Sequence, residues 1–432
     1  MKRILRRVVI TGLGVIAPNG IGKEDFWNAC ICGRSGVRRI TRFDASHLST
    51  QIAGEVADFI PQTLDITLEE ARSLDRGTQF ALAAANLALQ DAAFPVTTLN
   101  EDERNRFGVY LGSAMAGVEE GEKLWLQLTN RGTQLPAVAE NEPVPGTILL
   151  NSLVPASAVA AHHQLYGPCT VISTGCSAGA DAIGEAFWAI QEGRADRMLA
   201  GGSDSSISYL GVNVFSVMKA LSTRNDEPER ASRPYDGQRD GFVLAEGAGM
   251  LLLEERAIAL ERGAHIYAEL VSFTSNSNAY HMTALPADGA PLQDLLRRGL
   301  SAACITAEQL DYINSHGSST LSNEPAETAA YKVVFGDHAY RIPISATKSM
   351  IGHSQGAASA IETIVTALVI EQQMIPPTIN QEQDDPLCDL DYVPNVARRA
   401  TVNLALTHSS GFGGVNSALI LARADWRSLH DE

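Results

Sequence analysis

The sequence has 432 residues, of which 45% are apolar and 19% are charged, and its formal net charge at pH 7 is −17. These proportions are typical of a globular protein and exclude a disordered chain. So negative a charge argues against nucleic acid as a partner, and an acidic protein could dock only on a local patch of basic residues. No stretch approaches the roughly 18 apolar residues of a membrane span, so we expect a cytoplasmic protein with no membrane partner.

Short runs rich in Val, Ile and Leu recur along the chain and predict buried strands. In chain order these runs are residues 8–11, 107–111, 170–172, 198–201, 250–253, 266–273, 312–314, 343–345, 402–406 and 418–421, with helical patterns at 69–92, 177–191 and 356–372. Strands that alternate with helices predict an α/β protein whose parallel-rich sheet is covered on both faces. Residues 115–155 lack clear periodicity and are expected to form an excursion from the sheet. A join near residues 260–263 would divide the chain into two halves, 1–260 and 261–432.

The most suggestive segment is residues 171–180, which runs from a buried strand through a glycine-rich turn into a helix. Cys176 lies in this turn, close to the helix N-terminus, where unpaired N–H groups favour the thiolate over the thiol. Small neighbours leave room for a substrate. A buried structural cysteine would fit the same turn, so this segment alone leaves both interpretations open.

Other strand ends carry further reactive side chains. His316 follows the strand at 312–314, and Lys348 and His353 lie in the turn after 343–345. Glu362 follows His353 by nine residues. Each of these alone could be structural. Together, one cysteine and two histidines at strand ends predict a nucleophile site, because ligands bind at the carboxyl ends of strands in open α/β sheets. No cysteine pair has zinc spacing, and we expect no metal.

Several ordered motifs make the chain resemble a β-ketoacyl-[acyl carrier protein] synthase of the ketosynthase II-like class, nearly from end to end. They are residues 9–14, 221–225, 232–236, 241–249, 279–283 and 411–416, besides the segments above. The resemblance implies a thiolase fold, in which two similar halves form a five-layered α/β/α/β/α body that is normally dimeric. It implies no tightly bound cofactor, since the substrate is carried on the phosphopantetheine arm of an acyl carrier protein.

By this resemblance Cys176 would hold the acyl chain, while His316 and His353 would polarise the malonyl thioester carbonyl during decarboxylation. These residue types suit the reaction because thiolate is both nucleophile and leaving group, and imidazole N–H donors stabilise a developing enolate oxygen. The backbone N–H groups of Cys176 and Phe412, the latter in the glycine-rich loop 407–416, would hold the tetrahedral oxyanion.

The resemblance also assigns supporting roles. Lys348 and Glu362 would form a charged pair beside the histidines. Ser318 and Thr320 would hydrogen-bond the phosphopantetheine arm, and Ser410 would shape the acyl pocket entrance.

Three cations match positions or neighbourhoods that meet the carrier protein in this family: Arg72, Lys219 and Arg224. They would supply the basic patch that an acidic partner needs. An ordinary solvated surface would carry the same cations, and the sequence leaves the two interpretations equal.

Within the family, residues 153–157, 171–176 and 327–332 resemble the ketosynthase α subunit of type II polyketide systems. Ser410 stands where fatty-acid elongators commonly carry Phe. Residues 321–324 depart from both groups, so a fatty-acid-elongating 3-oxoacyl-ACP synthase II remains the alternative. A homodimer and a heterodimer with a chain-length factor are both open.

Two hypotheses that assign the chain to another functional class are weaker. A non-catalytic chain-length partner would lack the nucleophile, whereas Cys176 is present. A dinucleotide-binding oxidoreductase would explain Gly12 and Gly14, but Pro18 and Asn19 interrupt the helix that should receive the pyrophosphate.

Overall fold

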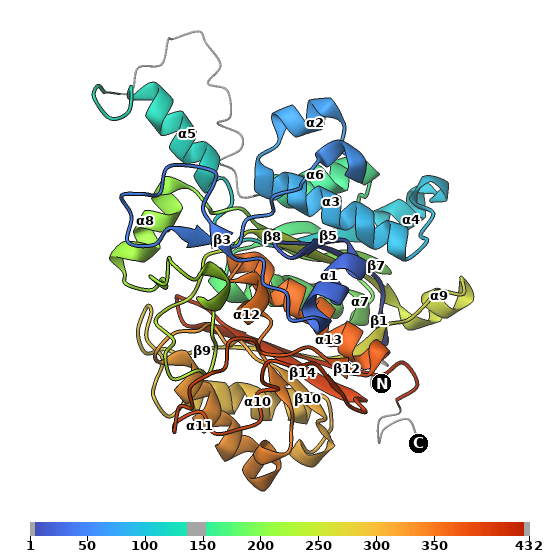
Figure 1. Cartoon of the computed structure of the whole chain (residues 1–432). Coiled ribbons are helices and arrows are strands. Elements are labelled where there is room, and N and C mark those ends of the chain that lie inside the picture. Colours follow the sequence, from blue (N-terminus) through green and yellow to red (C-terminus); the bar gives the residue numbers. More distant parts are fainter. Residues whose placement is uncertain (1–4, 136–152, 427–432) are drawn as a thin grey trace.

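The computed structural model describes residues 5–135 and 153–426. One mixed sheet runs through the molecule in the order β11-β10-β14-β15-β9-β1-β8-β7-β5-β6 (Figure 1). The strands in this order are β1 (Val8–Ala17), β5 (Phe107–Gly112), β6 (Cys169–Ile172), β7 (Arg197–Asp204), β8 (Gly247–Glu255), β9 (Ala268–Ser277), β10 (Tyr312–Asn314), β11 (Ile344–Ser345), β14 (Leu404–Ser410) and β15 (Val415–Ala422), and the short β2 (Gly20–Ile21) also belongs to the sheet by pairing with β1. Each of the ten apolar runs of the sequence lies in or overlaps one of these strands.

The prediction of a parallel-rich sheet is wrong. Strands β5–β6, β5–β7, β10–β11 and β10–β14 pair in parallel, whereas β1, β8, β9 and β15 pair antiparallel with all their neighbours in this order. Helices cover both faces, so parallel and antiparallel strands are buried alike and read as the same continuous apolar runs.

The strand order divides into two parts, β11-β10-β14-β15-β9 and β1-β8-β7-β5-β6, and the main helices form three layers around them. They are α3 (Arg76–Asp91), α6 (Val154–His163), α7 (Ala178–Gln191), α10 (Ala290–Ala302), α11 (Asn323–Phe335) and α13 (Ala358–Gln372). Helix α3 packs on β1 and β8, α7 on β5 and β7, and α10 on β9 and β15, while α13 contacts both β8 and β14. Figure 1 therefore shows five layers, with α7 and α13 in the middle one.

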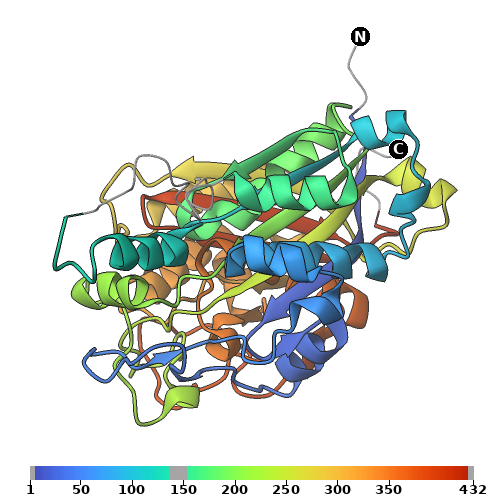
Figure 2. The same ribbon diagram turned by 90° about the horizontal axis from the view of Figure 1, so that it is seen from above.

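Shorter elements complete the chain. They are α1 (Lys23–Ile31), α2 (Leu68–Ser73), α4 (Glu101–Asn105), α5 (Val118–Leu128), α8 (Tyr209–Val217), α9 (Arg256–Glu261), α12 (Lys348–Ile351), β2 (Gly20–Ile21), β3 (Arg38–Arg39), β4 (Ile52–Ala53), β12 (Met374–Ile375) and β13 (Arg398–Arg399). The excursion predicted at 115–155 contains α5, which lies beside α8 at one end of the molecule in Figures 1 and 2, and the start of α6. Its residues 136–152 lie outside the described part.

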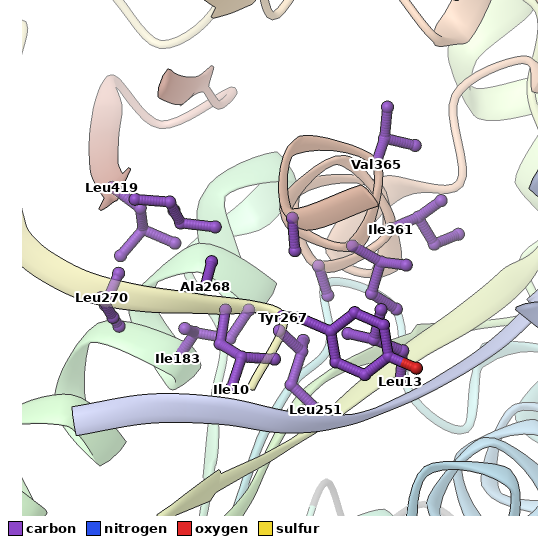
Figure 3. Packing of buried hydrophobic residues seen from close by; sticks show 14 of the residues in the cluster. Ile10, Leu13, Ile183, Leu251, Tyr267, Ala268, Leu270, Ile361, Val365 and Leu419 are labelled. Atoms are coloured by element: carbon purple, nitrogen blue, oxygen red, sulfur yellow. The ribbon is translucent and has the colours of Figure 1, made fainter. Parts of the chain in front are cut away.

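The central core lies where α13 meets β1, β8 and β9. Ile10, Leu251 and Leu270 from the strands gather there with Ile361 and Val365 of α13 (Figure 3). All five side chains are at most 1% exposed, so this packing fixes the position of α13, including its first residues, relative to the sheet. The start of α13 in turn positions the turn that carries the second histidine.

The glycines near the N-terminus serve helix packing. Gly12 and Gly14 lie inside β1, and a Cβ on them would come within 2.2 Å of the Ala88 carbonyl oxygen and 1.8 Å of the Ala84 carbonyl oxygen, both in α3. They let α3 lie directly on the strand, and no dinucleotide loop follows β1, which continues to Ala17.

The single helix predicted over 69–92 is also wrong, because the structure has two helices there. Leu74 is extended and ends α2, and the Asp75 carboxylate caps α3 by accepting a hydrogen bond from the Thr78 N–H. Between the halves, α9 and a short loop separate β8 from β9. We propose the division into 1–260 and 261–432 at this connection.

Candidate active site

Three turns bring the candidate nucleophile and both histidines to one cavity. Cys176 lies in a short 3₁₀ turn, Gly175–Ser177, between β6 and α7. His316 follows β10, and His353 follows α12 just after β11. All three side chains line a cavity with about 530 Å³ of space between its atoms, part of it open to solvent.

Two glycines allow the nucleophile turn and the loop 411–414 to touch. Gly175 has φ 64°, and a Cβ on it would lie 3.0 Å from the Phe412 carbonyl oxygen. A Cβ on Gly411 would lie 3.1 Å from the Cys176 nitrogen. This close approach directs the Phe412 N–H at the Cys176 sulfur.

The ionisation of the thiol differs from the sequence expectation. Burial raises the pKa of Cys176 to about 11, and the Phe412 N–H and the Lys348 charge offset only part of this rise. Desolvation therefore outweighs the favourable helix N-terminus, and the resting nucleophile is a thiol.

This shift predicts slow alkylation of the free protein. With a pKa of about 11 rather than 9.0, Cys176 should carry about 100-fold less thiolate at pH 8. The rate at which iodoacetamide labels the Cys176 peptide, followed by mass spectrometry, should still be rising at pH 10. A plateau near pH 9 would contradict the burial effect.

The two histidine rings lie close together in the wall of the cavity. Their ring centroids are 5.3 Å apart and their planes meet at 78°. The Gln355 N–H donates to His353 Nδ1 at 3.1 Å, and Lys348 Nζ lies 3.4 Å from His316 Nδ1. The Gln355 N–H can only donate, so His353 Nδ1 accepts and its proton lies on Nε2. His316 Nδ1 lies between Lys348 Nζ, which donates, and the Ser409 hydroxyl oxygen at 3.2 Å. Burial, followed by the Lys348 charge, lowers both imidazole pKa values well below 6.5, so both rings are neutral.

A buried ion pair supports the first histidine. Lys348 Nζ donates to Glu362 Oε1 at 2.5 Å and to the His316 carbonyl oxygen at 2.7 Å, and both charged side chains are at most 1% exposed. Burial raises the pKa of the Glu362 carboxyl, and the Lys348 charge opposes that rise. Removing either partner would leave an isolated buried charge, so the pair acts as a unit.

The expected substrate-binding hydroxyls line the same cavity. The Ser318 and Thr320 hydroxyl oxygens lie 3.1 Å apart, and Ser410 lies at the end of β14. The structure thus brings every expected binding residue to the candidate nucleophile.

The three expected docking cations differ in their surroundings. Arg72 at the end of α2 and Lys219 just after α8 are exposed. Arg224 is half-buried, and its guanidinium lies 3.3 Å from Glu227 and 3.5 Å from the Gln238 carbonyl oxygen. Its charge is therefore partly neutralised, which weakens it as a docking residue.

The sequence reasoning missed two contributors. The Ser409 hydroxyl donates to the Cys176 carbonyl oxygen at 3.0 Å and lies 3.2 Å from His316 Nδ1. Residues 281–285 line the cavity, and the Gly413 N–H donates to the Met282 carbonyl oxygen at 2.7 Å. The motif at 279–283 could have pointed to this second loop.

Comparison with known proteins agrees with this geometry. The family model of the β-ketoacyl synthase N-terminal domain matches residues 5–259, and that of the C-terminal domain matches residues 267–382. The chain belongs to the β-ketoacyl synthase family. Its fold is the thiolase fold, a mixed sheet with helices on both sides.

Relatives of this ketosynthase come from two pathways. It is 44% identical to the granaticin polyketide β-ketoacyl synthase 1 of Streptomyces violaceoruber over 97% of this chain and 99% of that one. It is also 44% identical to the 3-oxoacyl-[acyl-carrier-protein] synthase 2 of Coxiella burnetii, with the same coverage.

A solved type II polyketide ketosynthase, in complex with its acyl carrier protein and bound to the hexaketide, has a similar fold. Its TM-score is 0.90 at 39% identity, over 98% of this ketosynthase and 100% of that chain. Within residues 5–135 and 153–426, no helix is long and apolar enough to cross a membrane.

Proposed function

We propose that this ketosynthase extends an acyl chain held on Cys176 by decarboxylative condensation with a malonyl thioester, in a type II polyketide system. The observation that carries the proposal is the single cavity lined by Cys176, His316 and His353, with the Phe412 N–H at the sulfur. Such a site combines a nucleophile, two neutral N–H donors and an oxyanion hole.

In the first half-reaction the Cys176 sulfur attacks the acyl thioester carbonyl, and the N–H groups of Cys176 and Phe412 hold the oxyanion. The intermediate collapses by expelling the carrier thiolate, which takes up the proton of the Cys176 thiol. A resting thiol thus needs no net proton release, because the thiol proton leaves with the departing thiol.

In the second half-reaction the malonyl carboxylate leaves as CO₂, and its electron pair forms an enolate. The His316 and His353 Nε2–H groups donate to the enolate oxygen, which lowers the barrier to carbon–carbon bond cleavage. The enolate carbon attacks the acyl-Cys176 carbonyl, and the Cys176 thiolate leaves. The thiolate takes up one proton from solvent, which restores the thiol and balances the reaction.

The substrate arm would be phosphopantetheine, with its polar groups at Ser318 and Thr320. Hydroxyls suit this role since they can donate to or accept from an amide.

The assay that tests the proposal incubates the purified protein with acyl- and malonyl-carrier protein and detects β-ketoacyl-carrier protein by intact mass. Acylation without extension in the presence of malonyl-carrier protein would contradict it.

Carrier docking gives a separate prediction. Replacing Arg72 and Lys219 together by glutamate should raise the KM for the acyl-carrier protein about 10-fold and leave kcat within about two-fold, because both cations are exposed and the change would replace attraction to an acidic partner by repulsion. Steady-state kinetics measure this change. Arg298, an exposed cation on α10 that pairs with Asp294, supplies the control Arg298→Glu. An unchanged KM in the double variant would exclude these residues from the docking surface.

A second ketosynthase-like subunit is proposed to pair at β6. This strand pairs with β5 on one side, no described strand pairs with its other side, and its residues are at least partly exposed. An open edge is a template for another strand. Co-expression with a homologue that is encoded by a neighbouring gene and lacks the nucleophilic cysteine should yield a heterodimer. A fully active homodimer would favour the fatty-acid alternative.

A further inference from the structure

A buried arginine holds the loop that carries the two substrate-binding hydroxyls. The Arg239 side chain is 4% exposed. Its Nε donates to the Thr320 carbonyl oxygen at 2.8 Å, and its Nη2 donates to the Leu321 carbonyl oxygen at 3.3 Å. On the other side, Nη1 donates to the Asp236 carbonyl oxygen at 2.9 Å and to Asp385 Oδ2 at 2.6 Å. One guanidinium thus joins three separate loops.

The loop needs such support because its backbone is unusual. Gly317 has φ 39° and Ser319, which is not glycine, has φ 70°. Left-handed backbone in a residue with a Cβ persists only where surrounding contacts over-determine it. Here the Ser319 N–H donates to the Glu324 carboxylate, its hydroxyl accepts from the Arg233 N–H at 3.0 Å, and its carbonyl oxygen accepts from the Gly241 N–H at 3.1 Å.

The face of this loop away from the guanidinium lines the active-site cavity. Ser318 and Thr320 present their hydroxyls there, whereas Arg239 is not among the lining residues. Arg239 fixes the carbonyl groups of Thr320 and Leu321 on the face of the loop away from the cavity. Because these carbonyl groups are fixed, the direction in which the Thr320 side chain points into the cavity is fixed as well. Planar, forked donors suit this task because each N–H has a set direction, which an ammonium group lacks.

We propose that Arg239 is a positioning residue for the polar arm of the substrate, aligning the Ser318 and Thr320 hydroxyls with the amide and hydroxyl groups of a pantetheine thioester. This inference rests on the proposed function. Residues 232–241 lie behind the hydroxyl loop, and Arg239 contacts it through its side chain. Arg233 and Gly241 contact the loop only through their backbone N–H groups, which a substitution of the side chain leaves in place.

The test compares two malonyl thioesters that differ only in the arm. Malonyl-pantetheine carries the amides and hydroxyl, whereas the malonyl ethyl thioester has none. Arg239→Lys keeps the charge and loses the fork, so the KM for decarboxylation of malonyl-pantetheine should rise about 10-fold with kcat nearly unchanged. The kcat/KM for the ethyl thioester should stay within about two-fold of wild type.

Arg233→Lys is the matched control. Arg233 is fully buried in the same segment, but its side chain pairs with Asp236 at 2.9 Å and Glu382 at 3.1 Å instead of the hydroxyl loop. It should show no arm-dependent change in KM. If Arg239→Lys slowed both thioesters equally, or if Arg233→Lys gave the same selective loss, the proposal would be overturned.

Two further measurements keep the outcome decisive. Asp385→Asn weakens the anchor of Arg239 without removing the guanidinium, and it should raise the same KM if Arg239→Lys does not fold. Calorimetry with a malonyl-pantetheine amide analogue reads binding without turnover. A wild-type protein that binds the analogue but never decarboxylates the thioester would overturn only the proposed function. Equal affinity in wild type and Arg239→Lys would overturn only the role of Arg239, and no wild-type binding would overturn both.

Discussion

Replacing Cys176 by alanine should abolish acylation and reduce condensation by at least about 1000-fold, because no other described thiol lines the cavity. Intact-mass measurement after incubation with an acyl-carrier protein should show no adduct. Cys176→Gln should still release CO₂ from malonyl-carrier protein, since His316 and His353 remain in the cavity.

The matched control is Cys30→Ala. Cys30 is also a buried thiol whose pKa is raised by burial, but it lies in α1 and does not line the cavity. This variant should keep its acyl adduct. A persistent adduct on Cys176→Ala would exclude Cys176 as the acyl carrier. If Cys176→Gln released no CO₂ from malonyl-carrier protein, the histidines would not catalyse decarboxylation independently of Cys176.

Replacing His353 by alanine should slow malonyl decarboxylation by about 100- to 1000-fold, the usual effect of losing one donor to a developing oxyanion. Acylation of Cys176 should fall by less than about 10-fold, because the thiol and the Phe412 N–H are untouched. Release of labelled CO₂ and intact mass measure the two steps separately.

His316→Ala should slow decarboxylation to a similar extent, and it also removes the neighbour of Lys348 Nζ. His338→Ala is the control, since this half-buried histidine bonds the Leu310 carbonyl oxygen and lies outside the cavity. Equal losses in acylation and decarboxylation for His353→Ala would mean a general disturbance of the site instead of a donor to the enolate.

Much of the site could be predicted because its signals are local. The residues after three apolar runs carry Cys176, His316 and His353, and strand ends gather side chains at one edge of a sheet. The structure brings these three to a common cavity, together with the predicted Ser318 and Thr320. Their catalytic and binding roles stay predictions until the variants are measured.

Other features could not be predicted because they depend on distant segments. A thiol replaces the thiolate expected from the helix N-terminus, since burial outweighs the local dipole. Arg239 carried no signal of its own, because the hydroxyl loop that it holds and the carboxylate that anchors it lie 81 and 146 positions away.

The sequence by itself determined the family, the strand positions and the chemical types available at the strand ends. Those features depend on hydrophobic runs and short motifs, which can be identified without knowing which residues contact them in the fold. Tertiary structure alone decided which strands run antiparallel and how acidic Cys176 is. Strand pairing and desolvation both depend on residues that are far away in the chain.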